Sequence, residues 1–195
     1  MPPSRSTSLA SSQDVTQRVA GIVAGSLLMA LGAHVALPVP WSPVPLTGQT
    51  FALPLVVALL GARGATISLV LYLAEGVAGL PVFAPVAGGM AGIARLFAPS
   101  AGYLIAFPIA AYMTGWLFDR GLWRTFLGRA AAIAAGSAIV LAGGASWLAH
   151  FVGIELAFAL GVAPFLIGDA VKTLLAAGAA PWVRAGGLFA GLRDR

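Results

Sequence analysis

The sequence predicts an all-α integral membrane protein with six transmembrane helices. Hydrophobic residues make up 59% and charged residues 9% of its 195 residues, whereas soluble domains carry roughly 25% charged residues. The mean hydropathy of +0.95 agrees with a membrane protein. Glycine and alanine recur within the apolar runs. Because backbone groups must be satisfied inside lipid, such runs favour helices packed through small residues.

Composition also excludes several functions. The formal net charge is +5, but the arginines fall in short stretches between apolar runs, so we interpret the charge as a topology signal and expect no nucleic-acid partner. The chain has no cysteine, which rules out disulfides, thiolate metal sites and a cysteine nucleophile. Two scattered histidines argue against a catalytic zinc. We therefore expect neither a metal site nor catalytic residues.

The chain is expected to divide into a flexible cytoplasmic tail at 1–16, a transmembrane domain at 17–184 and a cytoplasmic C-terminal tail at 185–195. The first tail is polar and rich in serine. The first span, about 19–36, can cross a ~30 Å hydrocarbon core. Ala20, Gly21, Ala24 and Gly25 give this span small-xxx-small pairs. Packing inside this chain explains them, and docking of a separate membrane subunit is the alternative.

A proline-rich segment follows at 37–50, with the sequence LPVPWSPVPLTGQT. Four prolines between Pro38 and Pro45 exclude a helix and favour a stiff, extended segment. The segment carries no charge, and Trp41 suits the membrane interface. Such a loop can fold over a cavity as a lid, and an ordinary connection between helices is the alternative.

The second and third spans, about 51–60 and 65–78, are short and separated by glycines at 61 and 64. Neither crosses upright without extension, so irregular backbone near them must be shielded by protein. Glu75 lies near the end of the third span. An ion pair with Arg95 or a place at the interface explains this acid more readily than a ligand contact does.

Residues 79–102 form a loop rich in glycine and proline, with Arg95 as its single charge. The loop is too apolar to float in water, so we expect it to be structured. Arg95 either meets a lipid headgroup or points into a cavity. The guanidinium geometry matches a carboxylate, which favours the inward position.

The remaining spans are expected at about 103–117, 130–151 and 164–183. His150 ends the fifth span, where an interfacial imidazole is favoured over a titrating switch, and Glu155 follows in a short loop. Pro164 suits a first helical turn, so the sixth helix should begin near Ala163. At 1.5 Å per residue, Asp169 then lies about 7 Å below the top of this helix.

Asp169 and Lys172 place an acid and the only lysine inside the sixth span. Three residues apart, their side chains share one face of a helix. An ionisable group inside a membrane span is a functional hypothesis by default. The two groups can neutralise each other, or each can contact a ligand. A buried pair contributes little net stability for its desolvation cost, so we favour two ligand contacts.

The charge distribution predicts an orientation. With a cytoplasmic N-terminus, the outer loops carry only Arg95, which satisfies the positive-inside rule. The proline-rich segment, the glycine-rich loop and the top of the sixth span then share the outer surface, where a small-molecule site can form. The other arginines all fall on the cytoplasmic side: Arg5, Arg18, Arg63, Arg120, Arg124, Arg129, Arg184, Arg193 and Arg195.

Several motifs, in this order, resemble the BioY family, the substrate-binding S component of the energy-coupling-factor (ECF) type biotin transporter. They are PVPLTGQT at 43–50, LYL at 71–73, GLPVFA at 79–84, GG at 88–89, APSAGYL at 98–104 and PFLIGDAVK at 164–172. The TxQT, GLPVF and GDxxK elements are specific in combination. The family's usual GPTGGY appears here as APSAGY, so no backbone contact is carried over to that stretch.

The resemblance implies a six-helix ECF S-component fold in the prokaryotic plasma (inner) membrane. Such a subunit binds biotin with high affinity from outside and delivers it to the cytoplasm. A transmembrane coupling subunit and two ATPase subunits supply the energy, so this chain needs no cofactor, and only those partners use ATP. Ala20 and Ala24 match the face by which S components dock on the coupling subunit.

The resemblance also implies site residues. We expect Lys172 and Arg95 to engage the biotin carboxylate and Asp169 to accept from the ureido N–H groups. An S component for a different vitamin is an alternative. An integral-membrane enzyme is another, although a lone acid and lysine equip it poorly. Three further residues are weaker assignments to the binding site: Thr47, Gln49 and Tyr103.

Overall fold

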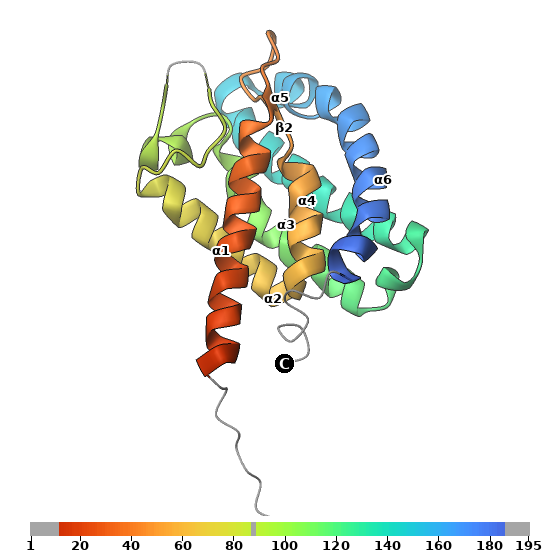
Figure 1. Ribbon diagram of the computed structural model, residues 1–195. Coiled ribbons are helices and arrows are strands. Elements are labelled where there is room, and N and C mark those ends of the chain that lie inside the picture. The colour runs from red at the N-terminus through yellow and green to blue at the C-terminus, as the bar shows by residue number, and fades with distance from the viewer. Residues whose placement is uncertain (1–11, 87–88, 186–195) are drawn as a thin grey trace, which may run out of the picture.

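The computed structural model describes residues 12–86 and 89–185, and most of both expected tails lies outside them. Helix α1 (Ser12–His34) begins inside the stretch that was expected to be an N-terminal tail. Five stretches of the described chain are long and apolar enough to cross a membrane, which agrees with the predicted class. Figure 1 shows one helical bundle, with the β-hairpin and α5 at one end. The elements after α1 are β1 (Ala36–Leu37), β2 (Leu46–Thr47), α2 (Gln49–Val77), η1 (Gly92–Phe97), α3 (Ala101–Asp119), η2 (Leu122–Arg124), α4 (Phe126–Val152), α5 (Ile154–Gly161) and α6 (Ala163–Ala185).

Helix α2 contains both the second and the third expected spans and folds back between them. Gly61 has φ 70° and ψ −178°, a conformation that glycine adopts without the usual steric cost. The Nε2 atom of Gln49 donates to the hydroxyl of Tyr72 at 2.9 Å, across 23 residues. A straight helix would hold these residues about 35 Å apart. The two arms of α2 therefore form a V, visible in Figure 1, with its vertex at Gly61.

Small residues let the helices approach closely. A Cβ atom at Gly102 of α3 would collide with the carbonyl oxygen of Gly143 and with Trp147, both on α4. A Cβ atom at Gly115 of α3 would collide with the backbone of Ala62, beside the bend in α2. Helix α3 thus packs between α2 and α4 at backbone contact, as expected for a bundle assembled in lipid.

The proline-rich segment forms a short antiparallel hairpin, in which Ala36 pairs with Thr47. The prediction that it is not helical is confirmed through Gly48 and is wrong for Gln49 and Thr50, which begin α2. The hydroxyl of Ser42 donates to the carbonyl oxygen of Leu160 in α5 at 2.8 Å. The hairpin is therefore fastened to α5, and it is an ordered cover over this end of the bundle.

One connection differs from expectation, and the glycine-rich loop is structured as expected. Glu155 lies in the first turn of α5, so the short loop predicted there was wrong. The stretch IELAFALG at 154–161 consists mainly of good helix formers, which suffices for two turns. The glycine-rich loop contains the 3₁₀ helix η1, and this element positions Arg95. The sixth helix begins at Ala163, as predicted.

We expect Gly102→Ala to lower the free energy of unfolding by about 1–3 kcal/mol, because the new methyl group overpacks a contact between two backbones. Thermal unfolding of the purified protein, followed by tryptophan fluorescence, measures the effect. Gly178→Ala is the matched control, since a Cβ atom there meets nothing within 4 Å. Equal melting temperatures for the two variants would contradict the close α3–α4 packing.

Candidate ligand-binding site

A narrow cavity of about 50 Å³ lies beneath the hairpin, between α2, α3, α4, α6 and η1. Ligand sites for small organic molecules typically measure about 300–1,000 Å³, so the lining must move apart to admit one. Its apolar lining residues are Val44, Pro45, Ala84, Leu104, Phe107, Val140, Leu141 and Phe165. Its polar lining residues are Thr47, Gln49, Thr50, Arg95, Ser100, Tyr103, Asp169 and Lys172. The structure thus brings together all six residues predicted for the binding site.

The acid and the lysine of α6 lie at one end of this cavity and contact each other. The Nζ atom of Lys172 is 2.9 Å from Oδ1 of Asp169, so the pair that we did not favour is formed. Nζ also donates to the hydroxyl of Thr50 and to the carbonyl oxygen of Thr47, both at 2.9 Å. An ammonium group has three N–H donors, and all three are engaged.

Asp169 keeps one oxygen unengaged. Its Oδ1 accepts from Lys172 and, at 2.8 Å, from the hydroxyl of Thr50. Its Oδ2 is buried and has no hydrogen-bond partner among the described residues. A buried carboxylate oxygen without a donor is unfavourable. The pair therefore offers one free acceptor to a ligand, while Lys172 and Thr50 hold the carboxylate in place.

Arg95 lies at the other end of the cavity, and only 2% of its surface is exposed. Its Nε and Nη1 atoms are buried and have no hydrogen-bond partner among the described residues. The guanidinium carbon is 5.9 Å from the centre of the Phe83 ring. Burial lowers the pKa of the guanidinium, because water no longer solvates its charge. Of the two positions expected for Arg95, the structure has the inward one.

Of the explanations considered for Glu75, the ion pair with Arg95 is not formed. One carboxylate oxygen of Glu75 accepts from the hydroxyl of Ser26 on α1 at 3.1 Å, and within the described residues the other has no partner. Glu75 thus faces α1. An anion from outside the chain can satisfy the donors of Arg95, and a carboxylate fits the guanidinium geometry.

The weaker assignments line the cavity, but their polar groups bond to the protein. The hydroxyl of Thr47 donates to Oε1 of Gln49 at 3.3 Å, and the amide of Gln49 donates to Tyr72. The hydroxyl of Tyr103 donates to the carbonyl oxygen of Gly161 at 2.6 Å. In this conformation these three residues shape the walls of the cavity.

Sequence reasoning missed Thr50 as a site residue. It stands in the TGQT motif that was quoted for the family resemblance, and a hydroxyl in the first turn of a helix beneath a lid was an available signal. The apolar residues between the two polar ends carried no signal, because Phe107 and Leu141 are ordinary members of apolar runs. Only the fold identifies them as cavity walls.

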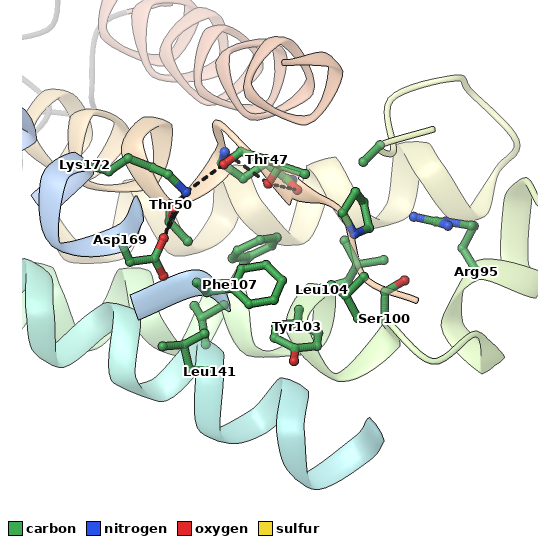
Figure 2. Close-up of a pocket in the computed structure, with 16 residues that line it drawn as sticks. Thr47, Thr50, Arg95, Ser100, Tyr103, Leu104, Phe107, Leu141, Asp169 and Lys172 are labelled. Carbon is green, nitrogen blue, oxygen red and sulfur yellow. Dashed lines mark hydrogen bonds and ion pairs between the residues drawn. The ribbon is translucent and has the colours of Figure 1, made fainter. Parts of the chain in front are cut away.

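Figure 2 shows the arrangement as a whole. Lys172, Thr50 and Asp169 cluster at one end, and Arg95 stands at the opposite end, with Phe107, Leu104 and Tyr103 in the region between. Such a cavity suits an elongated ligand with an anionic group at one end, an apolar middle and N–H donors at the other end.

The small residues of α1 lie on two different faces of the helix. Gly25 packs against Val56, Leu60 and Ser68 of α2, so part of the small-xxx-small pattern serves packing within the chain. Ala20 and Ala24 are exposed on the other side of α1. They leave a shallow surface on which another helix could approach closely.

Comparison with known proteins gives a consistent picture. Residues 4–187 match the model of the BioY family. A protein of Pyrococcus horikoshii named probable biotin transporter BioY is 38% identical over 149 residues, covering 76% of this chain and 85% of that protein. Biotin transporter BioY2 of Lactococcus lactis is 36% identical over 155 residues, covering 76% and 83%. The solved S-component for biotin from an ECF-type ABC transporter has a TM-score of 0.79 at 26% identity, covering 94% of this chain and 98% of that one.

We expect Tyr103→Phe to lower the free energy of unfolding by about 1–3 kcal/mol, because it leaves the buried carbonyl of Gly161 without this donor. Thermal unfolding measures the change. Tyr112→Phe is the matched control on the same helix, since Tyr112 is half exposed and should be insensitive. If Tyr103→Phe behaves like the control, the hydroxyl of Tyr103 has no structural role.

Proposed function

The chain belongs to the BioY family, and from this membership we propose that it binds biotin in the cavity between Arg95 and Asp169 and carries it across the membrane as the S component of an ECF transporter. It is a multi-pass prokaryotic membrane protein. The family is one of transporter S components, which removes the integral-membrane enzyme as an alternative. The observation that carries the proposal is the buried, unpaired guanidinium of Arg95, which lies at the opposite end of an apolar cavity from Asp169.

Biotin matches the two ends of the cavity. It has a carboxylate on an apolar chain and a ureido ring with two N–H donors at its far end. We assign the carboxylate to Arg95 and a ureido N–H to Oδ2 of Asp169. Both contacts are charge-assisted, and both replace water that the protein groups lose on burial.

Lys172 receives a different role from the one expected. Its expected share in binding the carboxylate requires proximity to Arg95, whereas Figure 2 places the two at opposite ends. In our proposal Lys172 orients Asp169 and joins the hairpin through the carbonyl oxygen of Thr47. Because the cavity is narrow in this conformation, we propose that the hairpin moves to admit biotin and that this bond then breaks.

Delivery requires partners. We propose that a transmembrane coupling subunit docks on the exposed face of α1 at Ala20 and Ala24, and that two ATPase subunits use ATP on its behalf. The positive-inside rule places the N- and C-termini in the cytoplasm and the cavity outside. The cavity then loads from the side opposite the ATPases. A different vitamin is the remaining alternative for the ligand.

We expect the purified chain to bind biotin, and thiamine or riboflavin not to displace it. Asp169→Asn should weaken biotin binding about 10- to 100-fold, because the ureido N–H then loses a charged acceptor. Isothermal titration measures both. Asp119→Asn, at an exposed acid outside the cavity, is the matched control. Displacement by another vitamin would overturn the ligand, and unchanged affinity in Asp169→Asn would overturn the site.

We expect Arg95→Gln to weaken biotin binding about 10- to 100-fold, because the carboxylate loses its cationic partner. Biotinamide has no charge at that end, so the variant and the unmodified protein should bind it with similar affinity. Arg63→Gln, an exposed arginine on α2, should change neither affinity. Equal losses for biotin and biotinamide would show that Arg95 does not bind the carboxylate.

A further inference from the structure

Four arginines gather at the end of the bundle away from the hairpin. Figure 1 shows the last turns of α6 beside the η2 connection and the start of α4, and these elements supply the side chains together with the end of α3. We call this set the arginine cluster: Arg120, Arg124, Arg129 and Arg184. None of these residues lines the cavity described above.

Arg129 is fixed by bonds to two neighbouring elements. Its Nε donates to the carbonyl oxygen of Ala177 in α6 at 2.8 Å, and its Nη1 donates to that of Trp123 in η2 at 3.0 Å. The carbonyl of Ala177 is available because Pro181, four residues later, has no N–H to offer it. This anchor gives η2 a defined position against α6.

Three of the four guanidinium groups lie over tryptophan rings. The guanidinium carbon of Arg184 lies 4.3 Å from the centre of the Trp123 ring, and that of Arg129 lies 5.7 Å from the same ring. Arg120 stacks in the same way on Trp116, at 4.3 Å. Two cations beside one ring repel each other, more strongly at the edge of an apolar bundle than in water. An anion between them would relieve that repulsion.

The described part of the chain supplies little negative charge to this cluster. Asp119 is the acid adjacent in sequence, and it is exposed. Within residues 12–86 and 89–185 the only ion pair is that of Asp169 with Lys172, so Asp119 pairs with none of the arginines. Among the described residues no carboxylate neutralises these four cations, so the cluster has capacity for a further anion.

The surroundings of the cluster are those of a membrane interface. Trp182 is 82% exposed and Leu127 is 78% exposed, and both belong to helices apolar enough to cross a membrane. Tryptophan favours the headgroup level of a bilayer. Basic pockets between transmembrane helices at that level attract anionic headgroups. The anion presented to this surface in a membrane is a lipid phosphate.

We propose that the arginine cluster binds the phosphate of an anionic phospholipid, with Arg184, which shares the Trp123 ring with Arg129, as the principal contact and Arg120 as a second cation at the same end of the bundle. Trp123 and Trp116 hold the two guanidinium groups in position. Arg129 in turn fixes Trp123 by donating to the carbonyl oxygen of that tryptophan. The acyl chains extend along the exposed apolar surface beside Leu127. A free phosphate in solution shares the headgroup chemistry but makes none of these apolar contacts.

The test measures lipid retained by the full-length chain. The protein is equilibrated in bilayer discs of phosphatidylglycerol and phosphatidylcholine in equal parts, and native mass spectrometry counts each lipid bound after release. We expect selective retention of phosphatidylglycerol, reduced about fivefold for each arginine removed in Arg184→Gln and Arg120→Gln. Arg63→Gln, which removes an exposed arginine outside the cluster, should retain it fully. Biotin titration at the opposite end reports whether each variant is folded.

The outcomes separate the explanations. Equal retention of the two lipids by the unmodified protein overturns the proposal without reference to any variant. An equal loss in Arg63→Gln overturns the assigned site, because general surface charge then explains the selectivity. Release of phosphatidylglycerol by soluble glycerol phosphate at matched concentration assigns the site to free phosphate and overturns the lipid.

Discussion

The ammonium group of Lys172 joins three parts of the chain at one point. Its acceptors are a carboxylate on its own helix, the hydroxyl of Thr50 in the first turn of α2 and the carbonyl oxygen of Thr47 in the hairpin. A buried carboxylate in an apolar bundle is strongly unfavourable without a cation. The lysine therefore stabilises the buried charge of Asp169, whose second oxygen stays unpaired and is the acceptor in the proposed site. The shape of the cavity, the position of the hairpin that covers it and the stability of the buried charge therefore depend on the same three hydrogen bonds of Lys172.

The same requirement for satisfied polar groups recurs through the bundle. Tyr103 supplies a donor to the carbonyl oxygen of Gly161, and Arg129 does the same for the carbonyl that Pro181 leaves without its usual helical donor. Arg95 departs from this pattern within the described residues, since two of its buried donors have no acceptor. Among the same residues, Asp169 also keeps one unpaired oxygen at the opposite end of the cavity, and Arg18 and Glu75 each keep one unpaired atom outside the cavity lining. The two unsatisfied groups of the cavity are where we propose that a ligand completes the network.

Much of the fold and part of the site could be predicted from sequence. The start of α6 at Ala163 and the shared face of Asp169 and Lys172 follow from proline preference and helical periodicity, which are local properties. The bonding state of the pair is not local, because Thr47 and Thr50 lie more than 100 residues away. The sequence analysis favoured two ligand contacts because a buried pair contributes little net stability for its desolvation cost, and the distant partners of the pair left no local signal. The family resemblance identified Arg95 as a site residue, but only the tertiary structure shows that Arg95 and Lys172 lie at opposite ends of the cavity.

The fold-back of α2 has a consequence for selectivity. Thr50, in the first turn of one arm, donates to the carboxylate of Asp169, and the other arm leads through Gly79 toward the 3₁₀ helix that carries Arg95. The two polar ends of the cavity are thus attached to the two arms of a single V, whose opening depends on the backbone torsion at Gly61. Together with the hydrogen bond between Gln49 and Tyr72 that joins the two arms, this one glycine outside the cavity lining helps to set the distance between the two ends. In the proposed site, that distance limits the length of the molecule that fits.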